Sequence, residues 1–448
     1  MNRMALAAVA GALIFAAAFH VSAARAATET VVYSFCSQTH RAGCRDGASP
    51  DAGLISVRGI LYGTTSRGGD CGGGEGTVFS LDPKQGTLTT LHSFCDPRIS
   101  KDGSRPEAGV TWANGKLYGT TIGGGNARER TAGGAIRSGV TPRVRGLGTV
   151  FSVDPATGSE TVLHRFLAHS DGAYPEARVI ELSGTLYGTT TQGGTLCSGH
   201  GCGTVFSLDP ATGAETVVHA FGRKGDGRRP PAGLNHVNGI LYGTTPEGGA
   251  YGGGTVFSLD PATGAERVVY SFCAVNFPSC TDGQGPAAAL LGRNGLLYGT
   301  TDAGGASAAG TVFSVDPGTG VETVLYSFCT QSNCADGKYP EAGLIDVNGV
   351  LYGTTYFGGN GTYDCETGTS CGTVFSLDPS TAEETVLHSF CSQYGCPDGA
   401  YPNAGLVELN GTLYGTTPDY GAHGRGTVFA ITLAGPGNGA GRAHASDR

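Results

Sequence analysis

The positions on either side of a recurrent proline vary in chemistry within a fixed frame. The chain carries Asp-Gly-x-x-Pro seven times, and tyrosines, arginines and carboxylates flank the proline. Aromatic faces can stack on sugar rings, while guanidinium and carboxylate groups hydrogen-bond sugar hydroxyls. Eight of these flanking residues form the candidate ligand-binding set: Arg105, Glu107, Tyr174, Glu176, Arg229, Tyr339, Glu341 and Tyr401. The other flanking positions hold Ser49, Asp51, Pro231, Gly285, Ala287 and Asn403. The alternative interpretation is a solvated rim without a ligand.

The aspartates of Asp-Gly-x-x-Pro and several histidines are the other residues that could bind ions. Calcium loops place several acids at alternating positions, which these loops do not, so a repeated structural turn is the favoured interpretation. One strand position holds a histidine in four repeats and a tyrosine in three: His92, His164, His219, His388, Tyr33, Tyr270 and Tyr326. Exchange with tyrosine favours a packed amphipathic position. The sequence therefore predicts no metal and no cofactor.

Familiar catalytic motifs are missing from the sequence. It contains no Gly-x-Ser-x-Gly, no His-Glu-x-x-His and no phosphate-binding loop. No catalytic residue is predicted, although an active site assembled from distant loops stays open. The loop 123–147 is richer in charge, with one acid, Glu129, and five arginines: Arg128, Arg130, Arg137, Arg143 and Arg145. A solvated insertion is favoured over a patch that meets an anionic polymer.

Two motifs that recur seven times must position these residues. Leu-Tyr-Gly-Thr-Thr begins at Leu61, Leu117, Leu186, Leu241, Leu297, Leu351 and Leu413. Gly-Thr-Val-Phe begins at Gly76, Gly148, Gly203, Gly254, Gly310, Gly372 and Gly426. A period of about 55 residues indicates one supersecondary unit stacked on copies of itself.

Each repeat predicts four antiparallel strands. In the sixth copy these are residues 342–347, 350–355, 372–377 and 384–390, with the hairpin pair Asn348-Gly349 between the first two. Apolar side chains on both strand faces predict sheets packed on both sides. The glycine of Leu-Tyr-Gly-Thr-Thr suggests a close approach by a neighbouring sheet. The prediction is an all-β, seven-bladed β-propeller over residues 27–433; a β-solenoid is the competitor.

The ends of the repeat region give an independent indication. Residues 29–35 match a fourth strand without the first three, and residues 426–431 match a third strand without a fourth. We expect the N-terminal strand to complete the last blade and close the ring, which removes exposed strand edges. The tail 434–448, rich in glycine, alanine and charge, is predicted to be disordered.

The first residues predict export. Residues 1–26 combine Arg3, an apolar run and Ala24-Arg25-Ala26, the pattern of a secretory signal peptide. No later stretch is apolar enough to span a membrane. Signal removal loses two arginines and no acid, which takes the net charge from −9 to −11. This acidic balance argues against a nucleic-acid partner. We expect a secreted or periplasmic monomer.

Fourteen cysteines in an exported chain predict a disulfide framework. Six pairs are close in sequence: Cys36/Cys44, Cys197/Cys202, Cys273/Cys280, Cys329/Cys334, Cys365/Cys371 and Cys391/Cys396. Cys71 and Cys95 remain and are expected to pair. Zinc is the rival interpretation, but no Cys-x-x-Cys pair is present.

The motifs Leu-Tyr-Gly-Thr-Thr, Gly-Thr-Val-Phe-Ser and Asp-Pro-x-Thr-Gly resemble the GTVF tandem repeats of the choice-of-anchor repeat proteins, over nearly all of residues 29–432. The resemblance implies an exported bacterial propeller and transfers no biochemical activity. The leading functional hypothesis is a non-enzymatic binding propeller for a glycan or a surface protein. The alternatives are a carbohydrate-active lyase or hydrolase at the channel mouth, and a structural envelope protein.

Overall fold

A computed structural model describes residues 27–40, 43–71, 74–95, 101–125, 146–167, 170–361, 363, 365 and 370–433. The predicted signal peptide, the five arginines of the insertion and the predicted disordered tail lie outside the described residues.

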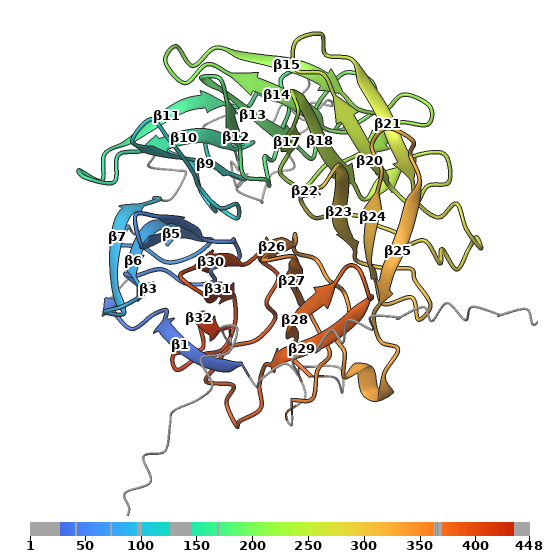
Figure 1. Cartoon of the computed structure of the whole chain (residues 1–448). Helices are drawn as coiled ribbons and strands as arrows, with labels where there is room; N and C mark the ends of the chain where they lie inside the picture. Colours follow the sequence, from blue (N-terminus) through green and yellow to red (C-terminus); the bar gives the residue numbers. More distant parts are fainter. Residues whose placement is uncertain are drawn as a thin grey trace, which may run out of the picture.

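Seven four-stranded antiparallel sheets form a ring, so the prediction of a seven-bladed β-propeller is confirmed (Figure 1). Blades 1 to 3 are β4(Ile55–Val57), β5(Ile60–Thr65), β6(Thr77–Asp82), β7(Thr87–Ser93); β8(Thr111–Ala113), β9(Lys116–Thr121), β10(Thr149–Val153), β11(Glu160–Arg165); and β12(Ile180–Leu182), β13(Thr185–Thr190), β14(Thr204–Leu208), β15(Glu215–Ala220).

Blades 4 to 6 follow in the same strand order. They are β17(Asn235–Val237), β18(Ile240–Thr245), β20(Thr255–Leu259), β21(Glu266–Ser271); β22(Leu291–Arg293), β23(Leu296–Thr301), β24(Thr311–Val315), β25(Glu322–Ser327); and β26(Ile345–Val347), β27(Val350–Thr355), β28(Thr373–Asp378), β29(Glu383–Ser389). Four short elements decorate the loops: the pair β2(Thr39–His40) and β3(Gly43–Cys44), the pair β16(Gly227–Arg228) and β19(Glu247–Gly248). A single 3-10 turn, η1(Ser332–Cys334), is the only helical segment among the described residues.

Blade 7 is built from both ends of the chain. It combines β30(Val407–Leu409), β31(Thr412–Thr417) and β32(Thr427–Thr432) with the N-terminal β1(Thr28–Ser34). β1 pairs antiparallel with β32, and Thr28 lies opposite Thr432. The predicted closure is therefore confirmed, and Figure 1 shows the blue β1 beside the red strands of blade 7.

Glycine is required in Leu-Tyr-Gly-Thr-Thr for a different reason from the one that the sequence suggested. A Cβ on Gly63 would lie 2.7 Å from both Phe79 Cζ and Leu54 Cδ2. Phe79 lies directly opposite Gly63 in the same blade, so the expectation of a neighbouring sheet is wrong. The phenylalanine of Gly-Thr-Val-Phe fills the space above the glycine of its own sheet.

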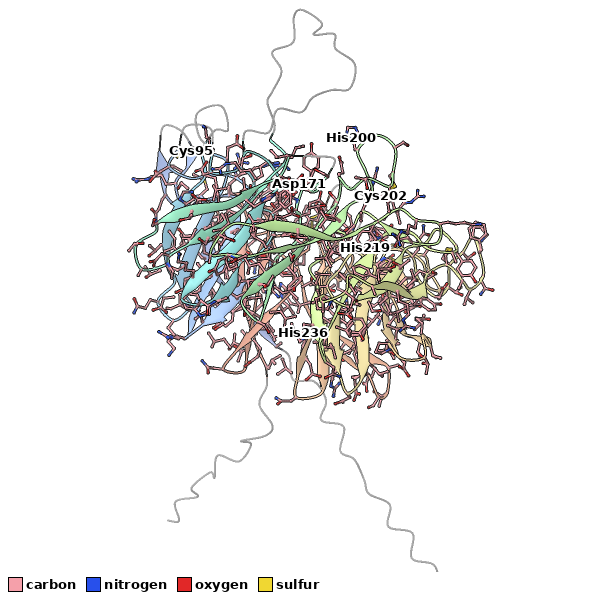
Figure 2. The ribbon with its side chains drawn as sticks, turned by 90° about the horizontal axis from the view of Figure 1, so that it is seen from above. Cys95, Asp171, His200, Cys202, His219 and His236 are labelled. Atoms are coloured by element: carbon pink, nitrogen blue, oxygen red, sulfur yellow. A yellow bond between two sulfur atoms is a disulfide. The ribbon has the colours of Figure 1, made fainter. Side chains whose placement is uncertain are left out.

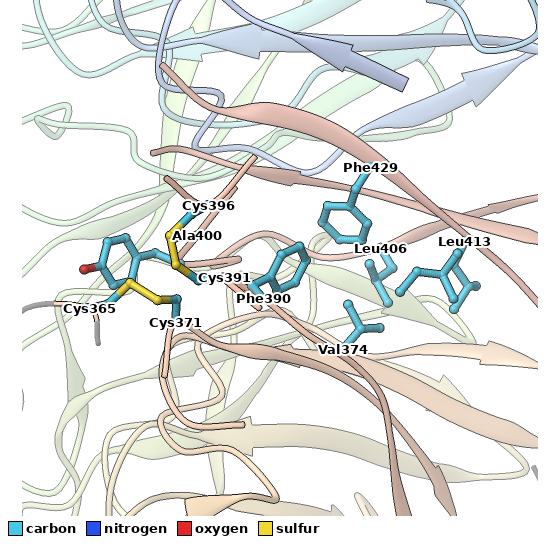
Figure 3. Close-up of a cluster of buried hydrophobic side chains, with 12 residues drawn as sticks. Cys365, Cys371, Val374, Phe390, Cys391, Cys396, Ala400, Leu406, Leu413 and Phe429 are labelled. Carbon is cyan, nitrogen blue, oxygen red and sulfur yellow. A yellow bond between two sulfur atoms is a disulfide. The ribbon is translucent and has the colours of Figure 1, made fainter. Parts of the chain in front are cut away.

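Neighbouring blades are joined by a repeated set of buried contacts. The first threonine of Leu-Tyr-Gly-Thr-Thr donates a hydrogen bond to an alanine carbonyl of the next blade, as Thr64 does to Ala108 at 2.9 Å. Thr416 donates to Ala52 in the same way and so joins blade 7 to blade 1. Edge-to-face phenylalanine pairs repeat around the ring, as in Phe390 and Phe429 with ring centroids 5.0 Å apart (Figure 3). The core thus lies between the blades.

All seven predicted disulfides are present: Cys36–Cys44, Cys71–Cys95, Cys197–Cys202, Cys273–Cys280, Cys329–Cys334, Cys365–Cys371 and Cys391–Cys396. The last two lie side by side next to Phe390, within the same buried cluster (Figure 3). A cysteine binds zinc only as a thiolate, and no free cysteine is present. These two disulfides instead extend the apolar core into the loops of blades 6 and 7.

Cys280 shows how a disulfide cysteine also connects loops through its backbone, as Cys44, Cys334 and Cys396 do in their repeats. Both Cys273 and Cys280 are buried, with 3% and 2% of their surface exposed. The Cys280 Sγ lies 3.4 Å from the Pro278 carbonyl oxygen; a disulfide sulfur has no proton to donate, so this is a packing contact. The Cys280 carbonyl accepts N–H groups from Gly283 at 2.9 Å and from Gly305 at 3.0 Å. Cys280 therefore joins the Asp-Gly loop of blade 5 to the loop that follows Leu-Tyr-Gly-Thr-Thr, a role that spacing alone does not reveal.

Candidate functional site

A polar cavity of about 570 Å³ opens at one mouth of the central channel. Its wall contains the residue that follows each recurrent proline, one from every repeat: Asp51, Glu107, Glu176, Pro231, Ala287, Glu341 and Asn403. The remaining wall residues are Ser49, Ser66, Arg67, Arg105, Asp302, Tyr356, Pro418 and Asp419. Six carboxylates face two arginines, so the cavity favours neutral or cationic ligands over anionic ones.

The loop that precedes each innermost strand holds this ring in place. The residue before the proline has a positive φ in all seven repeats, 57° at Arg105 and 56° at Tyr174. The Arg105 N–H donates to the Glu75 carbonyl at 2.7 Å, one residue before the glycine of Gly-Thr-Val-Phe. A Cβ on that glycine, Gly76, would lie 2.6 Å from Pro106 Cδ. Proline and glycine therefore recur together because each blade seats its proline against the glycine of the preceding blade.

The carboxyl groups of the cavity wall have raised pKa values. Reduced hydration, opposed by a hydrogen bond from Ser66 and reinforced by Glu107 and Asp419, raises the pKa of Asp51 to about 6. Reduced hydration and the charge of Asp302 raise the pKa of Glu341 to about 7. Both carboxyls face the cavity, yet surrounding protein atoms limit the water around them. Part of this ring is therefore protonated near neutral pH.

Two direct contacts order the wall further. Arg105 forms an ion pair with Glu107, with a nitrogen to oxygen distance of 2.5 Å. The Thr191 hydroxyl donates to Glu176 at 3.1 Å, and reduced hydration nevertheless raises the pKa of Glu176. Arg105, Glu107, Glu176 and Glu341 are thus the members of the predicted set that share one cavity.

The other four predicted residues lie outside the cavity wall. Arg229 pairs with Glu247 at 3.4 Å, and Tyr339 packs edge-to-face on Phe357, 6.2 Å between centroids. Tyr401 is 7% exposed and stacks on Tyr356 at 5.1 Å. The structure does not bring Tyr174, Arg229, Tyr339 and Tyr401 to the cavity with the carboxylates, and their ligand-binding role stays a prediction.

Sequence reasoning overlooked the second loop that reaches the cavity. Ser66, Arg67, Asp302, Tyr356, Pro418 and Asp419 follow Leu-Tyr-Gly-Thr-Thr directly and line the cavity. This position varies within a fixed frame just as the proline-flanking positions do. The same argument would therefore have found Asp302 and Tyr356.

The Asp-Gly aspartates anchor their own loops. Asp336 is buried, accepts a hydrogen bond from the Tyr326 hydroxyl at 2.9 Å, and accepts the Thr330 N–H at 3.0 Å. In the histidine-containing repeats the ring nitrogen replaces the hydroxyl, as with His388 Nε2 and Asp398 at 3.0 Å. The histidine or tyrosine therefore holds the Asp-Gly loop to the outermost strand.

The opposite mouth of the channel has a single arginine. A second cavity of about 490 Å³ contains Arg178 and His236, and Figure 2 shows His236 at the opposite end of the molecule from Cys202. At the position of Arg178 the other six repeats have glycine or alanine: Gly53, Gly109, Gly233, Ala289, Gly343 and Gly405. Reduced hydration lowers the pKa of Arg178. Arg178 is therefore the one bulky side chain in this ring of the channel.

The chain belongs to the Gloeobacter/Verrucomicrobia repeat family, which matches residues 17–199, 133–279 and 200–429. The resemblance to the choice-of-anchor repeats is not confirmed by this match. No curated protein matches the chain.

Solved structures match the chain at low identity and with TM-scores below 0.5. An oligogalacturonate lyase in complex with manganese is 12% identical, with a TM-score of 0.49, and covers 91% of this chain and 97% of its own. The oligogalacturonate lyase of Vibrio parahaemolyticus is 9% identical, TM-score 0.47, covering 92% and 98%. A chain of the nidogen/laminin complex is 14% identical, TM-score 0.40, covering 73% and 92%. These likenesses concern the fold alone.

Among the described residues, no helix is long and apolar enough to cross a membrane. The seven disulfides are consistent with an oxidising compartment outside the cytosol.

Proposed function

We propose that this protein is an exported, non-enzymatic binding propeller whose ligand is a neutral or amino-group-bearing glycan. The observation that carries the proposal is the carboxylate-rich cavity at the channel mouth, to which every repeat contributes one residue. Its carboxylates accept hydrogen bonds from sugar hydroxyls or ammonium groups, and Arg67 and Arg105 donate to ring and carbonyl oxygens.

The pattern of variation among the seven repeats supports the proposal. The proline, the glycine and both threonines of each repeat maintain contacts within or between blades, whereas the wall positions differ from blade to blade. A scaffold alone needs no such variety, while recognition of an asymmetric ligand does. The Cys71–Cys95, Cys365–Cys371 and Cys391–Cys396 disulfides stiffen nearby loops, which lowers the entropy lost on binding.

Thermal unfolding of the disulfide-intact protein against neutral, amino and acidic glycans tests the proposal. A ligand at about one hundred times its dissociation constant adds roughly 2.7 kcal/mol to the unfolding free energy. We expect a shift with neutral or amino glycans that is lost in Glu341→Gln and Asp51→Asn. Glu383→Gln, an exposed acid on the outermost strand of blade 6, is the control and keeps the shift.

Three other results would each replace the proposal. A shift with acidic glycans alone would contradict the charge argument. Turnover of any glycan would move the cavity to the carbohydrate-active class, which is not the favoured class. The lack of any shift in the glycan panel would redirect the search to surface proteins as ligands.

A further inference from the structure

Two consecutive blade interfaces each gather a histidine, an aspartate and a glutamate. His164, Asp171 and Glu215 meet between blades 2 and 3; in each such group, one donor atom per residue lies within 4.8 Å of the others. His219, Asp226 and Glu266 meet in the same way between blades 3 and 4. The side chains of Asp171 and His219, which are labelled in Figure 2, are 14% and 8% exposed.

A β-bulge in the outermost strand creates these groups. In β15, His219 pairs with Val205 and Val217 with Phe206, so Val218 is an extra residue. Side chains four positions apart in a regular strand point to the same face, and one extra residue reverses that relation. Glu215 therefore faces blade 2 while His219 faces blade 4. One strand thus supplies a ligand to each of two neighbouring interfaces.

The hydrogen bonding within these groups is incomplete. His164 Nε2 lies 3.3 Å from Asp171 Oδ2, and His219 Nε2 lies 3.4 Å from Asp226 Oδ2. The tyrosine hydroxyls at equivalent positions make shorter contacts, 2.9 Å from Tyr270 to Asp282. Within the described part of the chain, the buried Oε1 atoms of Glu215 and Glu266 have no hydrogen-bond partner, a property that they share with the equivalent Glu29, Glu160, Glu322 and Glu384.

Burial makes this arrangement costly without a cation. The side chains of His219 and Asp226 are 8% and 4% exposed, and Glu266 brings a second carboxyl group to the same place. Although Asp226 accepts backbone N–H groups from Gly222 and Gly227, two neighbouring buried carboxyls are costly to ionise together without a cation. One imidazole and two carboxylates form a nitrogen and oxygen donor set that suits a first-row divalent ion, which binds such atoms at about 2.0–2.2 Å.

We propose that the His164–Asp171–Glu215 and His219–Asp226–Glu266 groups are two structural zinc sites that clamp blade 3 to its neighbours. The proposal reverses the expectation drawn from the exchange of histidine with tyrosine. The exchange of histidine with tyrosine at this strand position distinguishes two kinds of blade interface. Where tyrosine is present, its hydroxyl donates a hydrogen bond to the aspartate. At these two interfaces, histidine provides a metal ligand instead. The zinc proposal is independent of the glycan proposal, because neither group lines the channel cavity.

Isothermal titration of the metal-stripped full-length protein with Zn²⁺, after removal of any affinity tag, tests the sites. All cysteines are disulfide-bonded, so thiols do not compete. We expect two equivalents of Zn²⁺, visible absorption bands on Co²⁺ substitution and a Tm raised by Zn²⁺. His164→Tyr and His219→Tyr each remove one equivalent and keep the fold, since tyrosine occupies this position in other blades.

A matched control lies in the same chain. His388 contacts Asp398 at 3.0 Å and is not part of a three-donor group among the described residues, so His388→Tyr keeps both equivalents. Glu266→Gln, which preserves shape, removes one equivalent without replacing the histidine. An unchanged stoichiometry in the two histidine variants, or no binding by the correctly folded protein, would overturn the proposal.

Discussion

At the residue scale, the carboxyls of the channel cavity connect pH to binding. The pKa of Asp51 is raised to about 6 and that of Glu341 to about 7. Each carboxylate accepts stronger hydrogen bonds when ionised. We expect glycan affinity to rise between pH 5 and pH 8, measured by titration at fixed ionic strength. Glu341→Gln should flatten the upper part of this dependence, and an affinity that falls with rising pH would contradict it.

A second group of acids connects pH to stability. Burial, reinforced by the charges of Asp282 and Asp336 respectively, raises the pKa values of Glu322 and Glu384 from 4.5 to about 8. A carboxyl that is harder to ionise in the folded state stabilises the fold fully below pH 4.5, and that stability is lost as pH rises to about 8. We expect the Tm to decrease across this range.

The chain provides its own test of this effect. Blade 1 has Leu88 at the position equivalent to Glu322, because both lie opposite the last apolar residue of the third strand. Glu322→Leu is therefore expected to raise the Tm at pH 8 and to change it less at pH 5. Thermal unfolding monitored by circular dichroism at both pH values measures the difference. An equal change at the two pH values would show that packing alone is responsible.

At the element scale, the strand glycines are fixed by the phenylalanine opposite them. A Cβ on Gly299 would lie 2.6 Å from Phe313 Cζ and 2.9 Å from Leu290 Cδ2. Because interiors are close-packed, Gly299→Ala should cost about 1–3 kcal/mol. Denaturant unfolding measures the loss.

Gly405→Ala is the matched control for this substitution. A Cβ there would lie 3.5 Å from its nearest neighbour, the Gly343 carbonyl oxygen, and Ala289 occupies the equivalent position in blade 5. We expect a change within about 0.5 kcal/mol. Equal losses in the two variants would mean that backbone flexibility, not the phenylalanine contact, requires the glycine.

The sequence predicts the strands and their order well, but not which side of the blade each side chain faces. Strict recurrence of Leu-Tyr-Gly-Thr-Thr and Gly-Thr-Val-Phe indicates the blades, and close spacing indicates six of the disulfides. The bulge residue Val218 leaves no sequence signal, so the opposite directions of Glu215 and His219 could not be foreseen. Tyr401 is buried because its ring packs on Tyr356 and Phe357, a contact between two loops that residue type alone does not reveal. Asp302, in contrast, could have been found, because the position after Leu-Tyr-Gly-Thr-Thr varies within a fixed frame.

At the scale of the whole molecule, ring closure depends on β1. Without it, β32 has an unpaired edge, and blade 7 loses the six register pairs that join β1 to β32. Deletion of residues 27–34 should abolish the cooperative unfolding transition and promote aggregation, measured by calorimetry and size-exclusion chromatography.

A circular permutant tests whether β1 must stand at the start of the chain or need only pair with β32. Thr28 and Thr432 are register partners, so a short linker can join residue 433 to residue 27. New ends can open in the exposed turn at Lys84 and Gln85. This permutant should regain most of the Tm of the parent protein. Failure to fold would mean that the order of the strands, and not only their pairing, is required.

Closure of the ring by its first and last strands also fixes the order in which parts of the newly synthesised chain can fold. Six of the seven disulfides join cysteines only five to eight positions apart, so each can form as soon as its own loop has been synthesised. β1 is synthesised before the other strands of the ring and its partner β32 after them, so blade 7 cannot assemble until all seven repeats are available. The disulfides in the loops of the binding face can therefore form one after another, before β1 and β32 pair and close the ring.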